Sequence, residues 1–201
     1  MAALELSRYE LIRLIQQVDQ QLAANTDHQH DLMMAGGAAV ALLWNDRRRT
    51  NDIDIVSEGM TDDLREAIER VAGDNKELDL KPGWFNDAAK VAVPNLEMPA
   101  TDSTLVYDGE RLRLYSAPAR VVLAMKLFAA RATDRKDALA LMREVGIASR
   151  QELYDLVRDG YGTALLRPAV QYFVDQVWEE YLGLNRGSNS ERAGPDLGLG
   201  L

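Results

Sequence analysis

The sequence predicts an α+β protein with an α/β front half and a helical back half. Short apolar strand candidates alternate with helical patterns through the first 115 residues. From Ser116 onward, apolar residues recur only at helical spacing. The length of 201 residues allows one good core with a small appended domain. The chain has no cysteine, which excludes disulfides, zinc-thiolate sites and cysteine nucleophiles.

The front half opens with a clear helix start. Ser7 and Glu10 have the spacing of a capping box, and apolar residues then recur every three to four positions. Near residue 105 the pattern changes to two short strands around Asp108-Gly109, which is typical of a β-hairpin. The elements expected between these two are a strand over 32–35, a short helix over 38–44, a strand over 52–56, a helix from 61 to 73 and a strand over 78–80.

The back half is predicted to be helical throughout. Residues 121–131 and 134–145 form one bent helix or two, and Pro168 suits the first turn of a last helix. We place the boundary at Ser116. Residues 1–115 then form a core with an N-terminal helix, residues 116–184 a helical region, and the Gly-rich polar residues 185–201 a disordered tail.

Charge and hydropathy limit which partners and which cellular location we expect for the protein. The formal net charge is −9, which disfavours an extended DNA or RNA footprint, although Arg47, Arg48 and Arg49 form one dense basic stretch. Residues 1–9 lack the basic start and apolar run of a signal peptide. No apolar stretch approaches the roughly 20 residues that span a bilayer. We expect a cytoplasmic enzyme or binding protein without a membrane partner.

Two carboxylates carry the strongest chemical signal. Asp52 and Asp54 alternate with isoleucines in a predicted strand, so both point to one face, with Cα atoms roughly 7 Å apart. Carboxylate oxygens suit Mg²⁺, which also accepts substrate phosphates. Two such ions can clamp the attacking and leaving oxygens of a phosphoryl displacement. The pattern therefore predicts a magnesium site.

A pair of glycines precedes these carboxylates. Gly36 and Gly37 lie between a predicted strand and a short helix. Glycine lets a backbone approach a phosphate closely, and a helix N-terminus attracts negative charge. Either motif alone is common, since an Asp-x-Asp is usually a solvated strand end and a Gly-Gly is usually a turn. Their order and spacing together are much more specific.

Gly36-Gly37, a short helix and the run from Arg49 through Thr50 to Asp52 and Asp54 resemble the signature of the DNA polymerase β-type nucleotidyltransferase superfamily. Within it, the sequence is most similar to the AbiEii-like toxin branch and related uncharacterised bacterial nucleotidyltransferases. The resemblance covers residues 32–142 and implies a short mixed sheet flanked by helices. It also implies transfer of a nucleoside monophosphate from an NTP to an acceptor hydroxyl on a tRNA end, a protein or a small molecule. A toxin–antitoxin role, an antitoxin partner or a homo-oligomer would fit this branch.

The resemblance also implies roles for individual residues. Lys126 would contact the triphosphate, and Asp137 would be a supporting or catalytic acid. An unbroken helix would place these two residues, eleven positions apart, on one face. The remaining roles are phosphate or nucleotide contact for Gly36, Gly37, Arg49 and Thr50, and catalytic metal binding for Asp52 and Asp54.

Two positions depart from the expected pattern. The branch often carries a second acid where this chain has Ala140, and polymerase-type sites use a third carboxylate on a neighbouring strand. Asp79 is the best candidate for that third metal ligand, with Asp87 and Asp108 as alternatives. Trp84 and Asn86 either line an acceptor pocket or belong to the edge of the core.

Two other classes of function stay open at this stage. A catalytically degenerate relative that binds nucleotide or a protein partner would explain Ala140 and the unassigned third acid. A metal-dependent glycosyltransferase also uses Asp-x-Asp, but the chain is short for a sugar-nucleotide domain. Convergence of Lys126 and Asp137 on Asp52 and Asp54 would favour the nucleotidyltransferase.

Overall fold

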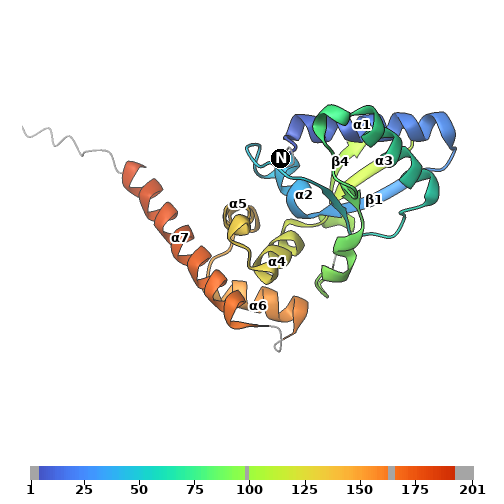
Figure 1. Cartoon of the computed structure of the whole chain (residues 1–201). Helices are drawn as coiled ribbons and strands as arrows, with labels where there is room; N and C mark the ends of the chain where they lie inside the picture. The colour runs from blue at the N-terminus through green and yellow to red at the C-terminus, as the bar shows by residue number, and fades with distance from the viewer. Residues whose placement is uncertain (1–4, 98–99, 163–165, 193–201) are drawn as a thin grey trace, which may run out of the picture.

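The computed structural model describes residues 5–97, 100–162 and 166–192. It has an α+β fold, with a mixed sheet among helices followed by a helical region, as the sequence predicts (Figure 1). The sheet order is β3-β2-β1-β5-β4. Its strands are β1 (His30–Ala35), β2 (Ile53–Ile55), β3 (Phe85–Asn86), β4 (Thr104–Asp108) and β5 (Leu112–Ser116).

The central strand sets the position of the two chemical motifs. β1 pairs antiparallel with β2 and parallel with β5. It runs directly into α2 (Gly36–Leu43), so the glycine pair stands at the end of the central strand. Because β2 lies beside that end, with Ala35 opposite Asp54, the carboxylates and the glycines meet at one edge of the sheet.

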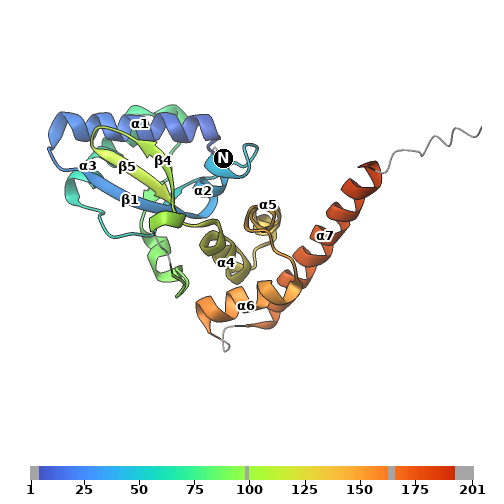
Figure 2. The ribbon, with the colours of Figure 1, turned by 180° about the vertical axis from the view of Figure 1, so that it is seen from behind.

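Helices of the front half cover the sheet. α1 (Arg8–Asn25) begins with the predicted capping box, in which Ser7 and Glu10 bond each other's backbone N–H groups. α1 and α3 (Asp62–Asp74) pack together beside the sheet in both views (Figures 1 and 2). Their buried side chains form one hydrophobic cluster with β1, β2 and β5.

The back half has its own hydrophobic cluster. It is built from α4 (Ala119–Ala129), α5 (Arg135–Val145), α6 (Arg150–Tyr161) and α7 (Pro168–Arg192). Ala35 and Val40 join it from the front half, so α2 connects the two clusters. The division between clusters falls near the predicted boundary at Ser116. None of the described helices has the length and apolar composition needed to cross a bilayer.

One predicted element is wrong. Residues 78–80 form no strand, because Lys76–Leu78 is a 3-10 helix (η1) and Asp79 follows in the left-handed region with φ of 47°. Aspartate is among the residues that tolerate this conformation. α7 extends to Arg192, into the segment from residue 185 that the sequence analysis assigns to a tail. Extending an existing helix costs far less than starting one. Residues 193–201 lie outside the described residues.

A buried carboxylate holds the β4–β5 hairpin against α1. Asp19 accepts hydrogen bonds from the backbone N–H groups of Glu110, Arg111 and Leu112 at 2.7–3.0 Å. It also accepts one from the hydroxyl of Tyr107 at 3.0 Å. One side chain of the first helix therefore satisfies three backbone donors in a hairpin turn about 90 residues away.

We expect Asp19→Ala to lower the free energy of unfolding by about 3 kcal/mol. Each partly buried donor that loses a charged acceptor destabilises the protein by about 1–3 kcal/mol, and hydrogen bonds to water offset part of that loss. Urea titration followed by circular dichroism measures the change. Asp27→Ala is the matched control. Asp27 pairs with Arg111 at 3.2 Å but is fully exposed, so its loss should leave stability almost unchanged. An equal loss in both variants would contradict this account.

Candidate active site

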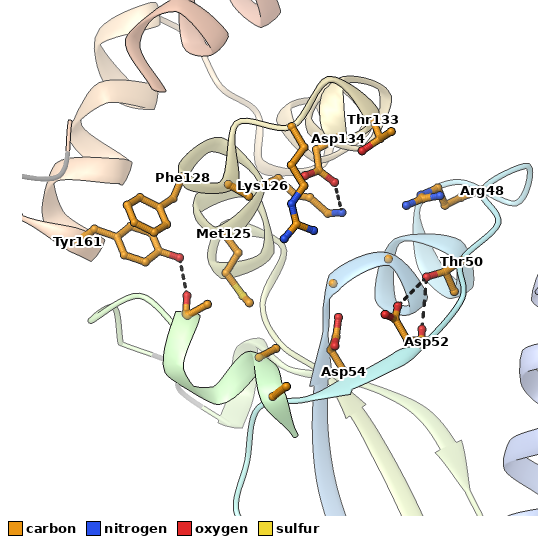
Figure 3. A pocket seen from close by; sticks show the side chains of 17 residues that line it. Arg48, Thr50, Asp52, Asp54, Met125, Lys126, Phe128, Thr133, Asp134 and Tyr161 are labelled. Carbon is orange, nitrogen blue, oxygen red and sulfur yellow. Dashed lines mark hydrogen bonds and ion pairs between the residues drawn. The ribbon is translucent and has the colours of Figure 1, made fainter. Parts of the chain in front are cut away.

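A cavity of about 490 Å³ lies where the carboxyl end of β1 meets the helical half. Figure 3 shows Asp52 and Asp54 pointing into it, across from Lys126 and Asp134. One wall therefore comes from the β1–β2 edge of the sheet and the other from α4 and the segment after it. The remaining wall is η2 (Ala88–Ala92), which follows β3.

The two carboxylates face the same space, as the alternation in the sequence predicts. Asp54 lies on β2 and Asp52 directly precedes it, so the strand is one residue shorter at each end than the predicted strand over 52–56. Thr50 fixes Asp52, because its hydroxyl donates to the Asp52 carboxylate at 3.1 Å. Ile53 and Ile55 point into the core and anchor the strand.

The environment of Asp54 disfavours its negative charge. Burial raises the pKa of this carboxyl, and the neighbouring Asp52 raises it further. Asn86, Lys126 and Arg131 act in the opposite direction, but the net shift remains upward. A cation between the two carboxylates would remove this penalty, because an opposite charge favours the ionised form.

Both glycines are required by close packing against these polar groups. Gly36 has φ of +72°, and a Cβ there would lie 2.6 Å from Asp54 Oδ2. A Cβ on Gly37 would lie 2.6 Å from the Thr50 hydroxyl oxygen. The glycine pair thus lets the start of α2 approach both carboxylate-bearing residues. Its predicted contact with phosphate is compatible with this position, since both glycines line the cavity.

The basic stretch contributes a different arginine from the one predicted. Arg49 does not line the cavity and pairs with Glu10 at 3.7 Å. Arg48 does line it, and its Nε atom lies 3.1 Å from Asp137 Oδ2. The sequence alone did not separate neighbouring arginines, because the loop conformation decides which one turns inward.

Lys126 lies at the centre of a buried ion-pair cluster. Its Nζ atom is 2.5 Å from Asp134 Oδ1 and 2.9 Å from Asp137 Oδ2. The side chain of Asp137 is fully buried and that of Asp134 nearly so. Asp137 does not line the cavity and contacts both Lys126 and Arg48, so its predicted role as a supporting or catalytic acid stays a prediction.

The contact between Lys126 and Asp137 does not arise from an unbroken helix. α4 ends at Ala129, Ala130 adopts the left-handed conformation with φ of 50°, and a 3-10 turn, η4 (Ala132–Asp134), leads into α5. This turn brings Asp134 beside Lys126, a contact that the helical spacing could not predict.

Arg131 is a cavity-lining cation that no pattern in the sequence singled out. Lys126 and Arg48 each have a carboxylate within 3.1 Å, whereas Arg131 has no ion-pair partner among the described residues. It is close enough to lower the pKa of Asp54. Arg131 is therefore the cation most available to a negatively charged ligand.

The candidates for a third acid lie elsewhere. Asp79, Asp87 and Asp108 do not line the cavity, and Asp87 pairs with Lys90 at 3.1 Å. The strand next to β2 instead carries Asn86, opposite Asp54. Trp84 is 2% exposed and belongs to the core, and it does not line this cavity. Ala140, which stands where the family branch often has a second acid, lines a separate cavity with Trp44 and Arg143. An acid at this position would therefore not face the main cavity.

Comparison with known families shows the protein family to which the chain belongs. A family described as nucleotidyltransferase of unknown function (DUF6036) matches residues 9–158. The chain belongs to this family. The match includes the glycine pair, both cavity carboxylates, Lys126 and Asp137, so every predicted site residue lies in the shared region. Searches of the curated proteins and of the solved structures found no match. The finer resemblance to AbiEii-like toxins stays a prediction.

Proposed function

We propose that this chain is a Mg²⁺-dependent nucleotidyltransferase that moves a nucleoside monophosphate from an NTP to an acceptor hydroxyl. The observation that carries the proposal is a cavity with Asp52, Asp54 and the glycine pair on one side and Lys126 and Arg131 on the other. Family membership supports the class of reaction. The cavity offers separate surfaces for a metal, a triphosphate and a nucleoside.

The carboxylate pair fits a magnesium ion. Asp52 and Asp54 both face the cavity, and the pKa of Asp54 is raised first by burial and then by repulsion from Asp52. A bound cation would offset both effects, because it favours the ionised carboxylate. Magnesium in phosphoryl-transfer sites is often bound by one or two carboxylates, with water and substrate phosphates as the other ligands. When bound, it would supply positive charge to the phosphates of the NTP.

The charges of the cavity also call for a cation. Arg48, Lys126 and Arg131 line it together with Asp52, Asp54 and Asp134, so the formal charges of these side chains cancel. A triphosphate would gain little net attraction from such a site without a metal ion. Arg131 and Lys126 are placed to approach the phosphates from the helical side.

The other end of the cavity suits a nucleoside. It is lined by alanines of η2 and by Met125 and Phe128 of α4. Phe128 stacks on Tyr161 with ring centroids 3.9 Å apart. The hydroxyl of Tyr161 donates to Ala92 O at 2.7 Å, and burial raises the pKa of this hydroxyl, so it stays a donor. This end has almost no side-chain groups free to read the edges of a base.

In the proposed reaction the acceptor oxygen attacks the α-phosphorus of the NTP. The bond from the α-phosphorus to the bridging oxygen breaks, pyrophosphate leaves, and the hydroxyl proton passes to a carboxylate. Asp52 and Asp54 face the cavity and can receive that proton, whereas Asp137 is buried away from it. Arg131 and Lys126 stabilise the negative charge on the leaving pyrophosphate.

Thermal unfolding with NTP and Mg²⁺ tests the binding part of this proposal. We expect a tenfold excess of NTP over its Kd to add about 1.4 kcal/mol, or a rise of roughly 3–6 °C for a chain of this size. The four NTPs should give similar shifts, because few side chains can read the base. Asp54→Ala should remove the shift. No shift with any NTP at millimolar concentration would contradict nucleotide binding.

The acceptor is open to a direct assay. Each NTP, labelled on the α-phosphate, is incubated with Mg²⁺ and total tRNA, cell protein or small-molecule fractions, and the label is followed. Growth arrest on expression of the wild type, but not of Asp54→Asn, would support a toxin role. Nucleotide binding without transfer to any acceptor would instead favour the alternative function, a catalytically degenerate protein that binds nucleotide. The presence of Asn86 in place of a third acid also favours this alternative.

A further inference from the structure

The residue beside Asp54 in the sheet is an amide and not an acid. β3 pairs parallel with β2, with Ile53 opposite Phe85 and Asp54 opposite Asn86. Residues directly opposite on neighbouring strands extend to the same face. Asn86 therefore occupies the position from which a neighbouring strand would present a third carboxylate to the site.

Hydrogen bonds fix the orientation of this amide. The N–H of Ala88 donates to Asn86 Oδ1 at 2.8 Å, and Asn86 Nδ2 donates to Gly83 O at 2.9 Å. A backbone N–H can only donate and a carbonyl can only accept, so the two ends of the amide cannot be exchanged. Consequently it is the NH₂ group that faces Asp54, with Nδ2 at 3.4 Å from Asp54 Oδ1.

We propose that Asp52 and Asp54 hold one divalent cation together with the triphosphate, and that Asn86 prevents a second cation from binding. This inference rests on the proposed function. Two cations about 3.5–4 Å apart repel each other and need shared anionic ligands. Among the described residues, no group of three or more His, Cys, Asp or Glu side chains is placed to hold a metal ion.

The donor group of Asn86 opposes a second ion directly. Its NH₂ group carries positive partial charge and already donates to Asp54 Oδ1, so this side of the carboxylate faces a donor and not an anionic ligand. The cations of the cavity replace the missing ion in neutralising phosphate charge. Arg131 is the one best placed to do so, because it lines the cavity without an ion-pair partner among the described residues.

Counting bound ions tests the inference without any activity measurement. Equimolar full-length protein and the α,β-methylene analogue of ATP are titrated with Mn²⁺, and free Mn²⁺ is followed by electron paramagnetic resonance. We expect one Mn²⁺ per wild-type complex and two per Asn86→Asp complex, with the second site at least about tenfold tighter than any in the wild type. The carboxylate of the variant would still accept a hydrogen bond from the Ala88 N–H. Asn86→Ala, which adds no carboxylate, should again bind one.

The outcomes separate this inference from the proposed function. Two Mn²⁺ ions in the wild-type complex would overturn the single-cation site while leaving nucleotidyl transfer standing. One Mn²⁺ in a folded Asn86→Asp complex would overturn the role of Asn86. A wild type that binds neither Mn²⁺ nor the analogue would overturn the proposed function itself. Should Asn86→Asp fail to fold by circular dichroism, the wild-type count still decides the stoichiometry.

Discussion

Replacing Asp54 with asparagine is expected to lower nucleotidyl transfer by about 10²- to 10³-fold, the loss that typically follows removal of one electrostatic group from an active site. Asparagine keeps the shape of the side chain but removes the charge that would bind the metal. The same substitution should make the metal-free protein more stable. The two effects have one cause, the burial of Asp54 beside Asp52.

The direction of the stability change follows from the pKa shift. The pKa of Asp54 in the folded protein lies above its ordinary value of 3.8, so the folded state holds this proton more tightly than the unfolded state. That stabilisation is present at low pH and is lost as pH rises through the raised pKa. At neutral pH the ionised carboxylate therefore lowers stability, whereas the neutral amide of the Asp54→Asn variant would not.

Thermal unfolding of metal-free Asp54→Asn at pH 7 and pH 4 measures this effect. The melting temperature of the variant should exceed that of the wild type at pH 7, and the gap should narrow at pH 4. Asp79→Asn is the matched control, since Asp79 lies outside the cavity, and it should match the wild type in both stability and transfer. A variant that keeps full transfer activity, in a preparation free of contaminating enzyme, would refute the mechanism.

Replacing Lys126 with alanine is expected to lower the free energy of unfolding by about 4 kcal/mol, since removing one partner of a buried ion pair leaves an uncompensated charge. Lys126 lies between Asp134 and Asp137, both buried. Asp137 would keep Arg48, but Asp134 has no other cation within ion-pair distance among the described residues. Urea titration measures the loss, and the additional variant Asp134→Asn should restore much of it.

Comparing Arg131→Ala with Lys126→Ala separates an effect on NTP binding from an effect on folding stability. Arg131→Ala breaks no ion pair among the described residues, so its unfolding free energy should stay near that of the wild type. Its affinity for NTP should fall roughly 10- to 100-fold, the effect of losing one charged hydrogen bond. Lys90→Ala, which removes two surface ion pairs, with Glu58 and Asp87, is the control for loss of a lysine. Equal destabilisation by Lys126→Ala and Lys90→Ala would contradict the buried cluster.

Local patterns in the sequence determined the elements and the carboxylate pair. The capping box at Ser7 and Glu10 predicted the start of α1, and the turn at Asp108-Gly109 predicted the β4–β5 hairpin. The two-residue period of a strand placed Asp52 and Asp54 on one face. These features depend on neighbours a few positions away, so the order of residues is enough to define them.

Only the tertiary structure decided which side chains complete the site. The loop before β2 turns Arg48 inward and leaves Arg49 with Glu10, although the two are neighbours in sequence. The left-handed turn at Ala130 brings Asp134 to Lys126, and strand pairing puts Asn86, and not Asp79, beside Asp54. Such contacts depend on how distant segments pack together, which no local pattern encodes.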